Sequence, residues 1–167
     1  MDVAKELDFS FWKEFRDIAH GANKDTLLIS EIFGDTSQWL QGDRFDGTMN
    51  YSFRESMTDY FATKRITNKE FADSLANLYS MYSFEALSSC QNLLSSHDVK
   101  RFLNRCGNEK DGMLGAIFLQ ATFPGIAGIY YGDEIGLGGA DDPFNREPFP
   151  WDNPVSYTHL RAHETAD

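Results

Sequence analysis

The sequence predicts an α/β fold in which parallel strands alternate with helices. Along the 167 residues, short apolar runs alternate with segments whose apolar residues recur at helical spacing. This alternation is typical of βα units that pair in parallel. Three acidic residues also lie beside such runs, namely Asp2, Glu31 and Asp98.

The first third of the chain contains one helix and two strands in this interpretation. Apolar residues between Phe11 and Ala19 recur at helical spacing with charged residues between them, which predicts an amphipathic helix. The run Leu27–Phe33 is short and apolar enough for a strand that is buried on both faces. Residues 34–44 are polar and predict a loop with room for one helical turn, and residues 45–53 predict a weaker strand.

Helices dominate the middle of the chain, and two further strands follow. Residues 54–63 have a helical pattern, and Thr67 with Glu70 forms a capping box that opens the next helix. Residues 92–98 predict a strand, and residues 125–136 contain the last one. The helix between them presents an apolar face made of Leu114, Ile117, Phe118 and Ala121. Four strands and the end of a fifth make a partial (β/α)8 TIM barrel, since a whole one typically needs about 250 residues.

Composition and charge limit the classes of partner that this chain is expected to bind. The net charge of −11 argues against a nucleic-acid partner, which requires basic patches. No apolar stretch approaches the roughly 20 residues of a membrane-spanning helix, so no membrane partner is expected. Cys90 and Cys106 form neither a C-x-x-C motif nor a secreted-type framework. Their pattern predicts free thiols and favours a cytoplasmic location over a secreted one without deciding it. No cofactor is expected.

The acidic residues at the strand ends indicate a candidate catalytic site. A parallel barrel gathers the carboxyl ends of its strands on one face, where catalytic groups collect. Two facing carboxyl groups are the minimum set of side chains that an enzyme needs to hydrolyse a glycosidic bond. For each residue taken alone, a structural role is an open alternative. The dipeptide His97–Asp98 also fits a metal-dependent phosphohydrolase, but such sites need clustered histidines, and only His20 and His97 precede the last fifteen residues. No metal site is therefore expected.

Six segments, taken in order and spacing, resemble the α-amylase superfamily of glycoside hydrolases. They are MDVAKEL (1–7), LLISEIF (27–33), WLQGDRFDGTMNYSF (39–53), SSHDVKRFL (95–103), TFPGIAGIYYGDEIG (122–136) and DDPFNREPFPWD (141–152). The third and the last segments are similar to the neopullulanase, cyclomaltodextrinase and maltogenic amylase group. The resemblance implies retaining hydrolysis of α-1,4-glucosidic bonds in maltooligosaccharides, cyclodextrins or pullulan.

The resemblance implies three catalytic roles. Asp2 matches the nucleophile that forms a covalent glycosyl-enzyme, and Glu31 matches the acid/base residue. Asp98 matches the carboxylate that binds sugar hydroxyls and stabilises the oxocarbenium-like transition state. In a retaining enzyme the nucleophile and the acid/base carboxyl lie about 5–5.5 Å apart. The apolar residues around Glu31 would raise its pKa, as an acid catalyst requires.

Three further residues are predicted to bind the substrate. His97 matches the histidine that hydrogen-bonds sugar in the cleavage subsite, and Arg101 matches an arginine found near Asp98 in this group. Phe33 is a candidate sugar platform, as are Trp39, Tyr51 and Trp151, with ordinary packing as the alternative for each. Asp133 and Glu134 also follow a strand, but the resemblance assigns them to loop structure.

The resemblance also predicts how the chain is organised. Residues 1–152 correspond to the C-terminal half of the catalytic barrel, from the end of strand 4 through strand 8. Residues 153–167 have no apolar period and include a string similar to translated sequencing-adapter sequence, so we expect a disordered or artefactual tail. The alternative function is that of a truncated, inactive fragment with at most sugar binding. The parent enzyme is expected to be a homodimer through an N-terminal domain.

Overall fold

A computed structural model describes residues 1–152, and the tail predicted at 153–167 lies outside the described residues. Four parallel strands pair in the order of the chain: β1 (Ile29–Ser30), β2 (Gly47–Asn50), β3 (Gln91–Leu93) and β4 (Ile126–Gly128). Helices connect β2 to β3 and β3 to β4, whereas a loop with one 3-10 turn (Ser37–Trp39) connects β1 to β2. The predicted α/β class with a partial barrel is therefore confirmed.

The first residue of the chain extends this sheet beyond β1. The amine of Met1 donates to the carbonyl oxygen of Ile29 at 2.7 Å, and the N–H of Glu31 donates to the carbonyl oxygen of Met1 at 3.0 Å. One residue that bonds to positions i and i+2 of its neighbour is the pattern of a parallel ladder. Met1 thus takes the place of the end of a further parallel strand, and Asp2 follows directly.

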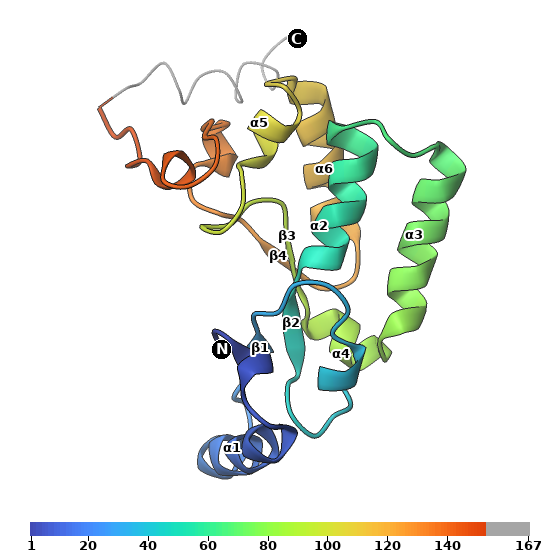
Figure 1. Ribbon diagram of the computed structural model, residues 1–167, viewed down its shortest axis with the longest axis vertical. Helices are drawn as coiled ribbons and strands as arrows, with labels where there is room; N and C mark the ends of the chain where they lie inside the picture. Colours follow the sequence, from blue (N-terminus) through green and yellow to red (C-terminus); the bar gives the residue numbers. More distant parts are fainter. Residues whose placement is uncertain (153–167) are drawn as a thin grey trace, which may run out of the picture.

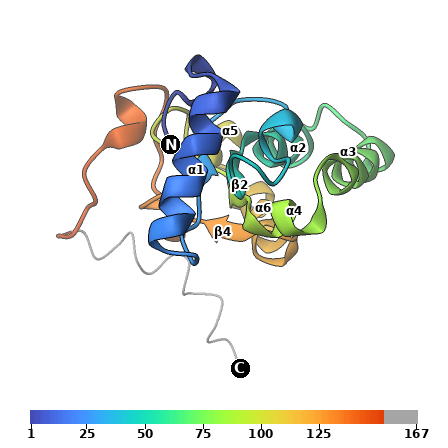
Figure 2. The ribbon, with the colours of Figure 1, turned by 90° about the horizontal axis from the view of Figure 1, so that it is seen from below.

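The helices lie before β1, between β2 and β3, and between β3 and β4. They are α1 (Phe9–Ala22), α2 (Tyr51–Met57), which a π-helical turn continues (Thr58–Ala62), α3 (Asn68–Met81), α4 (Phe84–Ser89), α5 (Phe102–Arg105) and α6 (Lys110–Thr122). Helices α2, α3, α4 and α6 lie on one side of the strands, whereas α1 and the segment 129–152 lie toward the other (Figures 1 and 2). No helix within residues 1–152 combines the length and the hydropathy needed to cross a membrane.

The predicted strand over residues 45–53 ends earlier than expected, because a helix cap interrupts it. Asn50 closes β2, and its side chain accepts a hydrogen bond from the N–H of Phe53 at 3.0 Å. That bond satisfies one of the free donors at the start of α2. The chain therefore passes from strand to helix without a loop, and Tyr51 begins the helix at the carboxyl end of β2.

The predicted apolar face of α6 was wrong in part. Leu114 and Phe118 are 47% and 67% exposed, whereas Met113, Ala116 and Gln120 are buried. Glycines explain the difference: a Cβ at Gly115 would lie 2.4 Å from the ring of Phe61, so the helix approaches its neighbours along its glycine side. Hydrophobic periodicity does not register such a contact, since glycine carries no side chain.

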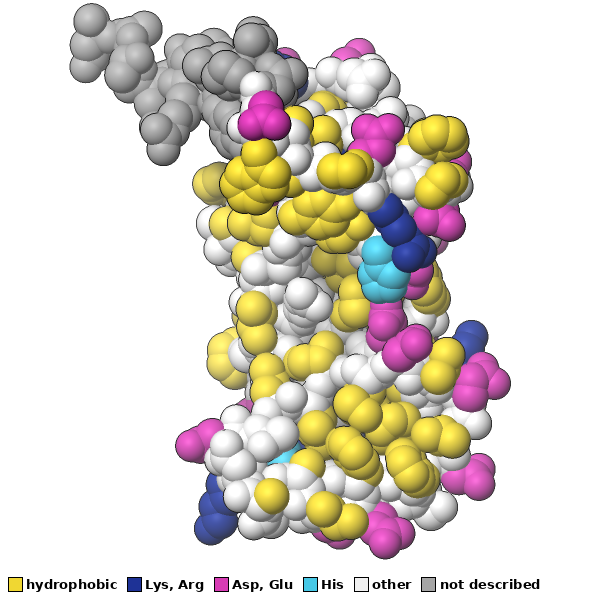
Figure 3. Space-filling model, turned by 90° about the vertical axis from the view of Figure 1, so that its left-hand side faces the viewer, with side chains coloured by type: hydrophobic (Ala, Val, Ile, Leu, Met, Phe, Trp, Pro, Cys, Tyr) yellow, Lys and Arg dark blue, Asp and Glu magenta, His cyan; other side chains and the backbone are white. Residues whose placement is uncertain are grey.

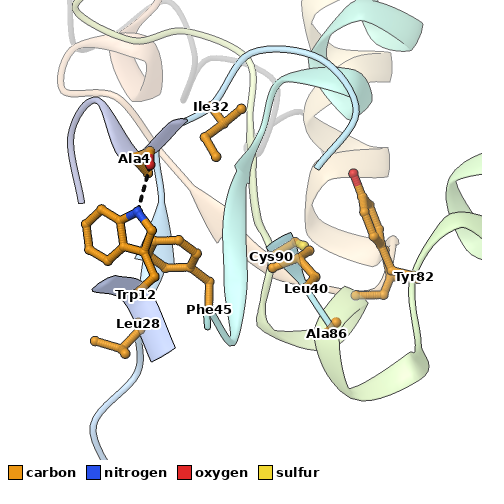
Figure 4. Packing of buried hydrophobic residues seen from close by; sticks show 10 residues of the cluster. Ala4, Trp12, Leu28, Ile32, Leu40, Phe45, Tyr82, Ala86 and Cys90 are labelled. Atoms are coloured by element: carbon orange, nitrogen blue, oxygen red, sulfur yellow. Dashed lines mark hydrogen bonds between the residues drawn. The ribbon is translucent and has the colours of Figure 1, made fainter. Parts of the chain in front are cut away.

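Two apolar clusters form the core. In the first, the indole N–H of Trp12 donates to the carbonyl oxygen of Ala4 at 2.7 Å, which ties the N-terminal segment to α1 (Figure 4). Its buried members are Ala4, Trp12, Leu28, Ile32, Leu40, Phe45, Tyr82, Ala86, Leu87 and Cys90. The second cluster packs α2, α3, α5 and α6 together around Phe53, Met57, Leu94 and Phe102. Both clusters pack between the strands and the helices, and this packing holds the strand ends in place.

The capping box predicted at α3 is present. The Thr67 hydroxyl accepts from the N–H of Glu70 at 3.3 Å, and the Glu70 carboxylate accepts from the N–H of Thr67 at 2.8 Å. We expect Thr67→Ala to lower the free energy of unfolding by about 1 kcal/mol, the typical cost of losing an N-cap side chain. Urea unfolding followed by circular dichroism measures this change. Thr67→Ser keeps the hydroxyl and serves as the control, and an equal loss in both variants would contradict the assignment.

Candidate active site

The candidate site lies at the carboxyl ends of the strands. Glu31 directly follows β1, and Ser95 to Asp98 follow β3. On the face turned away from most of the helices, a histidine lies beside a cationic side chain and acidic side chains (Figure 3). Segments that are distant in sequence thus supply one polar group of residues, as the parallel sheet predicted.

Glu31, His97 and Asp98 come together. The His97 Nε2 lies 3.8 Å from the Glu31 Oε1 and 3.4 Å from the Asp98 Oδ1. One nitrogen or oxygen from each residue lies within 4.8 Å of the other two. The side chain of His97 is 48% exposed and that of Asp98 is 38% exposed, so ligands from solvent can reach both. Three residues predicted for the site are therefore adjacent.

The Glu31 carboxyl is the most enclosed of the three. Its side chain is 17% exposed, and its Oε1 is buried without a hydrogen-bond partner among the described residues. A buried polar atom without a partner costs free energy and in native proteins calls for an explanation such as a catalytic role. A bound substrate with a hydroxyl or a glycosidic oxygen at this point would supply the partner.

Asp2 stands apart from this group. Its carboxylate accepts a hydrogen bond from the N–H of Val3 at 2.7 Å, and the residue is exposed. Val3 has a φ of 43°, a left-handed conformation that a β-branched residue rarely adopts. The Met1 ladder places Asp2 next to the end of β1, but its carboxyl is not part of the Glu31, His97 and Asp98 group.

An aromatic pair borders the group. The rings of Phe33 and Tyr51 stack with centroids 3.8 Å apart, and the Phe33 side chain is 55% exposed. The Tyr51 hydroxyl lies 3.1 Å from the Ser96 hydroxyl. Burial raises the pKa of Tyr51, the hydrogen bond with Ser96 opposes this shift, and the negative charges of Glu31 and Asp98 add to it. Phe33 is thus on a flat apolar surface next to the candidate catalytic residues, a geometry that suits a sugar face.

This aromatic pair also forms one wall of a pocket. The pocket has a volume of about 270 Å³ and continues from the rings toward Arg54, Glu55 and Arg105. The sequence considered Tyr51 only as one of several aromatic residues. Its position at the first turn of α2, directly after a strand end, is the signal that identifies it.

Asn145 holds the loop that carries His97 and Asp98. Its amide donates to the carbonyl oxygens of Ser96 at 3.4 Å, His97 at 2.8 Å and Val99 at 3.1 Å. Asn145 is fully buried within the segment 129–152. The sequence used this region only for its family resemblance, and nothing local indicates that an asparagine there reaches back to the strand end.

Arg146 lies next to Asn145 and reaches the same loop. Its Nε donates to the carbonyl oxygen of His97 at 3.1 Å, and its guanidinium lies 3.7 Å from the Asp98 Oδ1. The carboxylate of Asp142 holds it at 2.8 Å. A positive charge at this position balances part of the negative charge of Asp98.

We expect Asn145→Ala to lower the free energy of unfolding by about 2–3 kcal/mol, because three loop carbonyls lose their donor. The backbone amide resonances of His97 and Asp98 would shift in NMR spectra. Arg146→Gln is the control for a half-exposed contact to the same loop, with an expected loss of about 1 kcal/mol or less. Wild-type stability and unchanged loop resonances in Asn145→Ala would contradict the clamp.

Arg101 is a predicted sugar ligand that the structure places out of reach. Its side chain is fully buried, and its Nη1 donates to the carbonyl oxygen of Tyr131 at 2.7 Å and to Asp133 at 3.2 Å. The guanidinium carbon also lies 4.6 Å above the ring of Tyr130. Burial raises the pKa of Asp133 to about 6, against the lowering effect of Ser95 and Arg101. Arg101 therefore fixes the segment after β4, and a sugar contact would require it to be exposed.

Comparisons with known proteins identify the family of this chain. Residues 3–163 match the family model described as the alpha amylase catalytic domain. Neopullulanase 2 of Thermoactinomyces vulgaris is 45% identical over 152 residues, which are 91% of this chain and 26% of that protein. The cyclomaltodextrinase of Geobacillus thermopakistaniensis is 38% identical over 165 residues, with 96% of this chain and 28% of that protein covered.

Comparison with a solved structure shows the same family resemblance at the level of the fold. The ligand-free cyclic alpha-maltosyl-(1→6)-maltose hydrolase from Arthrobacter globiformis superposes with a TM-score of 0.90 at 33% identity, covering 96% of this chain and 38% of that one. The chain thus spans 26–28% of the length of these two curated relatives. Sequence and fold agree, and the chain belongs to the alpha-amylase catalytic domain family.

Proposed function

We propose that this chain carries the acid/base part of an active site that hydrolyses α-1,4-glucosidic bonds in maltooligosaccharides, cyclodextrins or pullulan with retention of configuration. The observation that carries the proposal is the half-buried Glu31, whose Oε1 has no hydrogen-bond partner among residues 1–152 and lies 3.8 Å from the His97 Nε2. The names of the relatives, a neopullulanase and a cyclomaltodextrinase, support an α-glucan oligosaccharide as the substrate.

The proposed reaction has two steps. In the first, Glu31 donates its proton to the glycosidic oxygen while the carboxylate of Asp2 attacks the anomeric carbon, so that a glycosyl-enzyme forms and the shortened glucan leaves. In the second, Glu31 takes a proton from water, the water oxygen bonds to the anomeric carbon, and Asp2 is released. Two displacements at one carbon retain its configuration.

The other residues bind and position the sugar in this proposal. The carboxylate of Asp98 accepts sugar hydroxyls and opposes the positive charge that develops on the ring, and His97 donates to a hydroxyl in the same subsite. The stacked Phe33 and Tyr51 offer an apolar platform beside the bond that breaks, where sugar rings gain dispersion and hydrophobic contact. Arg101 does not contact the sugar in this proposal, and its role is to hold the segment after β4 in place. Nucleic acid and membranes are not expected as partners, and dimerisation of a longer enzyme remains a prediction.

The exposed position of Asp2 favours a second candidate function, in which the chain binds sugar without hydrolysing it. Catalytic groups must be held within about 0.5 Å of their productive geometry. Asp2 is exposed, and the hydrogen bond recorded for its carboxylate comes from the neighbouring residue. An exposed carboxylate with this local contact is not held over the anomeric carbon.

A graft separates the two candidates. Residues 3–152 would replace the matching segment of Neopullulanase 2, so that the nucleophile comes from the host, and release of reducing sugar from β-cyclodextrin and maltotriose would be measured. We expect turnover in the graft and none above background in the chain alone. NMR of the first product should show the α-anomer. A graft that melts cooperatively yet is inactive would contradict the proposed function, and turnover by the isolated chain would contradict the second candidate.

A further inference from the structure

Three metal-ligating side chains meet at the candidate site without direct hydrogen bonds between them. The separations from the His97 Nε2 are 3.4 Å to Asp98 and 3.8 Å to Glu31. Hydrogen bonds between a nitrogen and an oxygen are about 2.7–3.2 Å long. The three groups therefore surround a space that a small atom can bridge, and the buried Oε1 of Glu31 faces no other partner among residues 1–152.

Two of the three separations in this group are close to those around a zinc ion, and the atoms of the third pair, Glu31 and Asp98, lie within 4.8 Å of each other. Zinc binds imidazole nitrogens and carboxylate oxygens at about 2.0–2.2 Å, which in a tetrahedron sets neighbouring ligand atoms roughly 3.3–3.6 Å apart. The His97 to Asp98 separation of 3.4 Å lies within that range, and the separation of 3.8 Å to Glu31 exceeds it by a few tenths of an ångström. Calcium is a poorer match, since it prefers six to eight oxygen ligands and no imidazole.

We propose that Glu31, His97 and Asp98 form a binding site for Zn²⁺, with water as the fourth ligand, that competes with α-glucan for the same position. The sequence predicted no metal site at His97–Asp98 because no further histidines cluster there. The folded chain supplies the third ligand from the end of another strand. The exposed side chains of His97 and Asp98 let a hydrated ion enter from solvent.

Neighbouring charges set the strength of this site. The guanidinium of Arg146 lies 3.7 Å from the Asp98 Oδ1 and opposes a second cation there. Asp142 holds that guanidinium at 2.8 Å, and Lys100 lies 3.5 Å from Asp141. When both carboxyl groups are ionised, the ligands carry two negative charges against one nearby positive charge, and the site then attracts a divalent cation. Removing the charge of Arg146 should strengthen binding.

Titration of the chain with zinc chloride at neutral pH tests the metal site directly. The double substitution His159→Gln and His163→Gln is made first, because these histidines are spaced four apart and lie outside the described residues. In that background, calorimetry is expected to find one zinc site. We expect His97→Gln and Glu31→Gln each to weaken it at least tenfold, and Arg146→Gln to strengthen it roughly threefold or more, as Coulomb interactions near a protein surface allow.

The matched control is His20→Gln. His20 lies 3.4 Å from Asp46, a histidine and carboxylate pair without a third ligand in the described part of the chain, and its loss should leave zinc binding unchanged. Zinc binding that survives both His97→Gln and Glu31→Gln would overturn the site, as would the absence of binding in the background chain. Circular dichroism of each variant confirms that the fold persists.

Only the competition with sugar rests on the proposed function. We expect maltotriose to raise the apparent zinc dissociation constant of the graft, and zinc to inhibit its turnover competitively. Zinc binding that depends on His97 but ignores maltotriose would leave the metal site standing and count against the proposed sugar position. Turnover that is insensitive to bound zinc would overturn the competition itself.

Discussion

Glu31→Gln is expected to lower kcat of the graft on maltotriose by about 100- to 10,000-fold, the usual contribution of a general acid or base. Glutamine keeps the size and the polarity of the side chain but can neither give nor take a proton. The loss should be smaller for the first step with a nitrophenyl maltoside, because nitrophenolate leaves without protonation. Stopped-flow release of nitrophenol separates that step from the hydrolysis of the intermediate.

Glu134→Gln is the matched control for this prediction. Glu134 also follows a strand at the same end of the sheet, is exposed, and takes no part in the proposed reaction. Its substitution should leave kcat unchanged. Equal losses in the two variants, or an equal loss on both substrates in Glu31→Gln, would remove Glu31 from the acid/base role.

Asp133→Leu is expected to destabilise the chain by about 3–5 kcal/mol, because it leaves a buried guanidinium without its counter-charge. Arg101 is fully buried, and Asp133 is the carboxylate paired with it, at 3.2 Å. The raised pKa of Asp133, about 6, indicates that burial outweighs the attraction between the two charges. The ion pair therefore fixes the position of the segment after β4 more than it adds to the free energy of unfolding.

The double variant Arg101→Met with Asp133→Leu tests this interpretation. Replacing both charges by apolar groups removes the unpaired ion, so we expect the double variant to be clearly more stable than Asp133→Leu alone. Urea unfolding at neutral pH measures the double variant and the two single variants, Asp133→Leu and Arg101→Met. A double variant that loses the sum of the two single losses would contradict the coupling.

The proposed zinc site illustrates why a negative prediction from sequence can differ from what the fold offers. No further histidine lies near His97 in the sequence, so the local pattern does not indicate a metal site. In the folded chain the missing ligand is a carboxylate that follows β1, brought to His97 by two intervening strand pairings. Ligand sets shared between strands are visible only once the register is known.

Hydrogen bonds between strands are another feature that local patterns did not reveal. The hydroxyls of Ser30 and Thr48 bond at 3.0 Å, and the amides of Asn50 and Asn92 bond at 2.9 Å, each pair in register across neighbouring strands. All four residues are buried. A polar residue in an apolar run looks like the end of a strand in sequence, whereas here it pairs with its counterpart and stays inside.

The sequence by itself determined the order of strands and helices, the capping box at Thr67, the family, and the strand ends that bear Glu31 and Asp98. These features depend on periodicity and on hydrogen bonds between near neighbours, which the chain encodes locally. Only the tertiary structure decided that Arg101 is buried, that Asn145 holds the His97 loop, that Asp2 stands outside the acidic group, and that glycines direct the packing of α6. Each of these depends on which surfaces meet after long-range packing, and that outcome follows from the close approach of distant segments and not from any one of them.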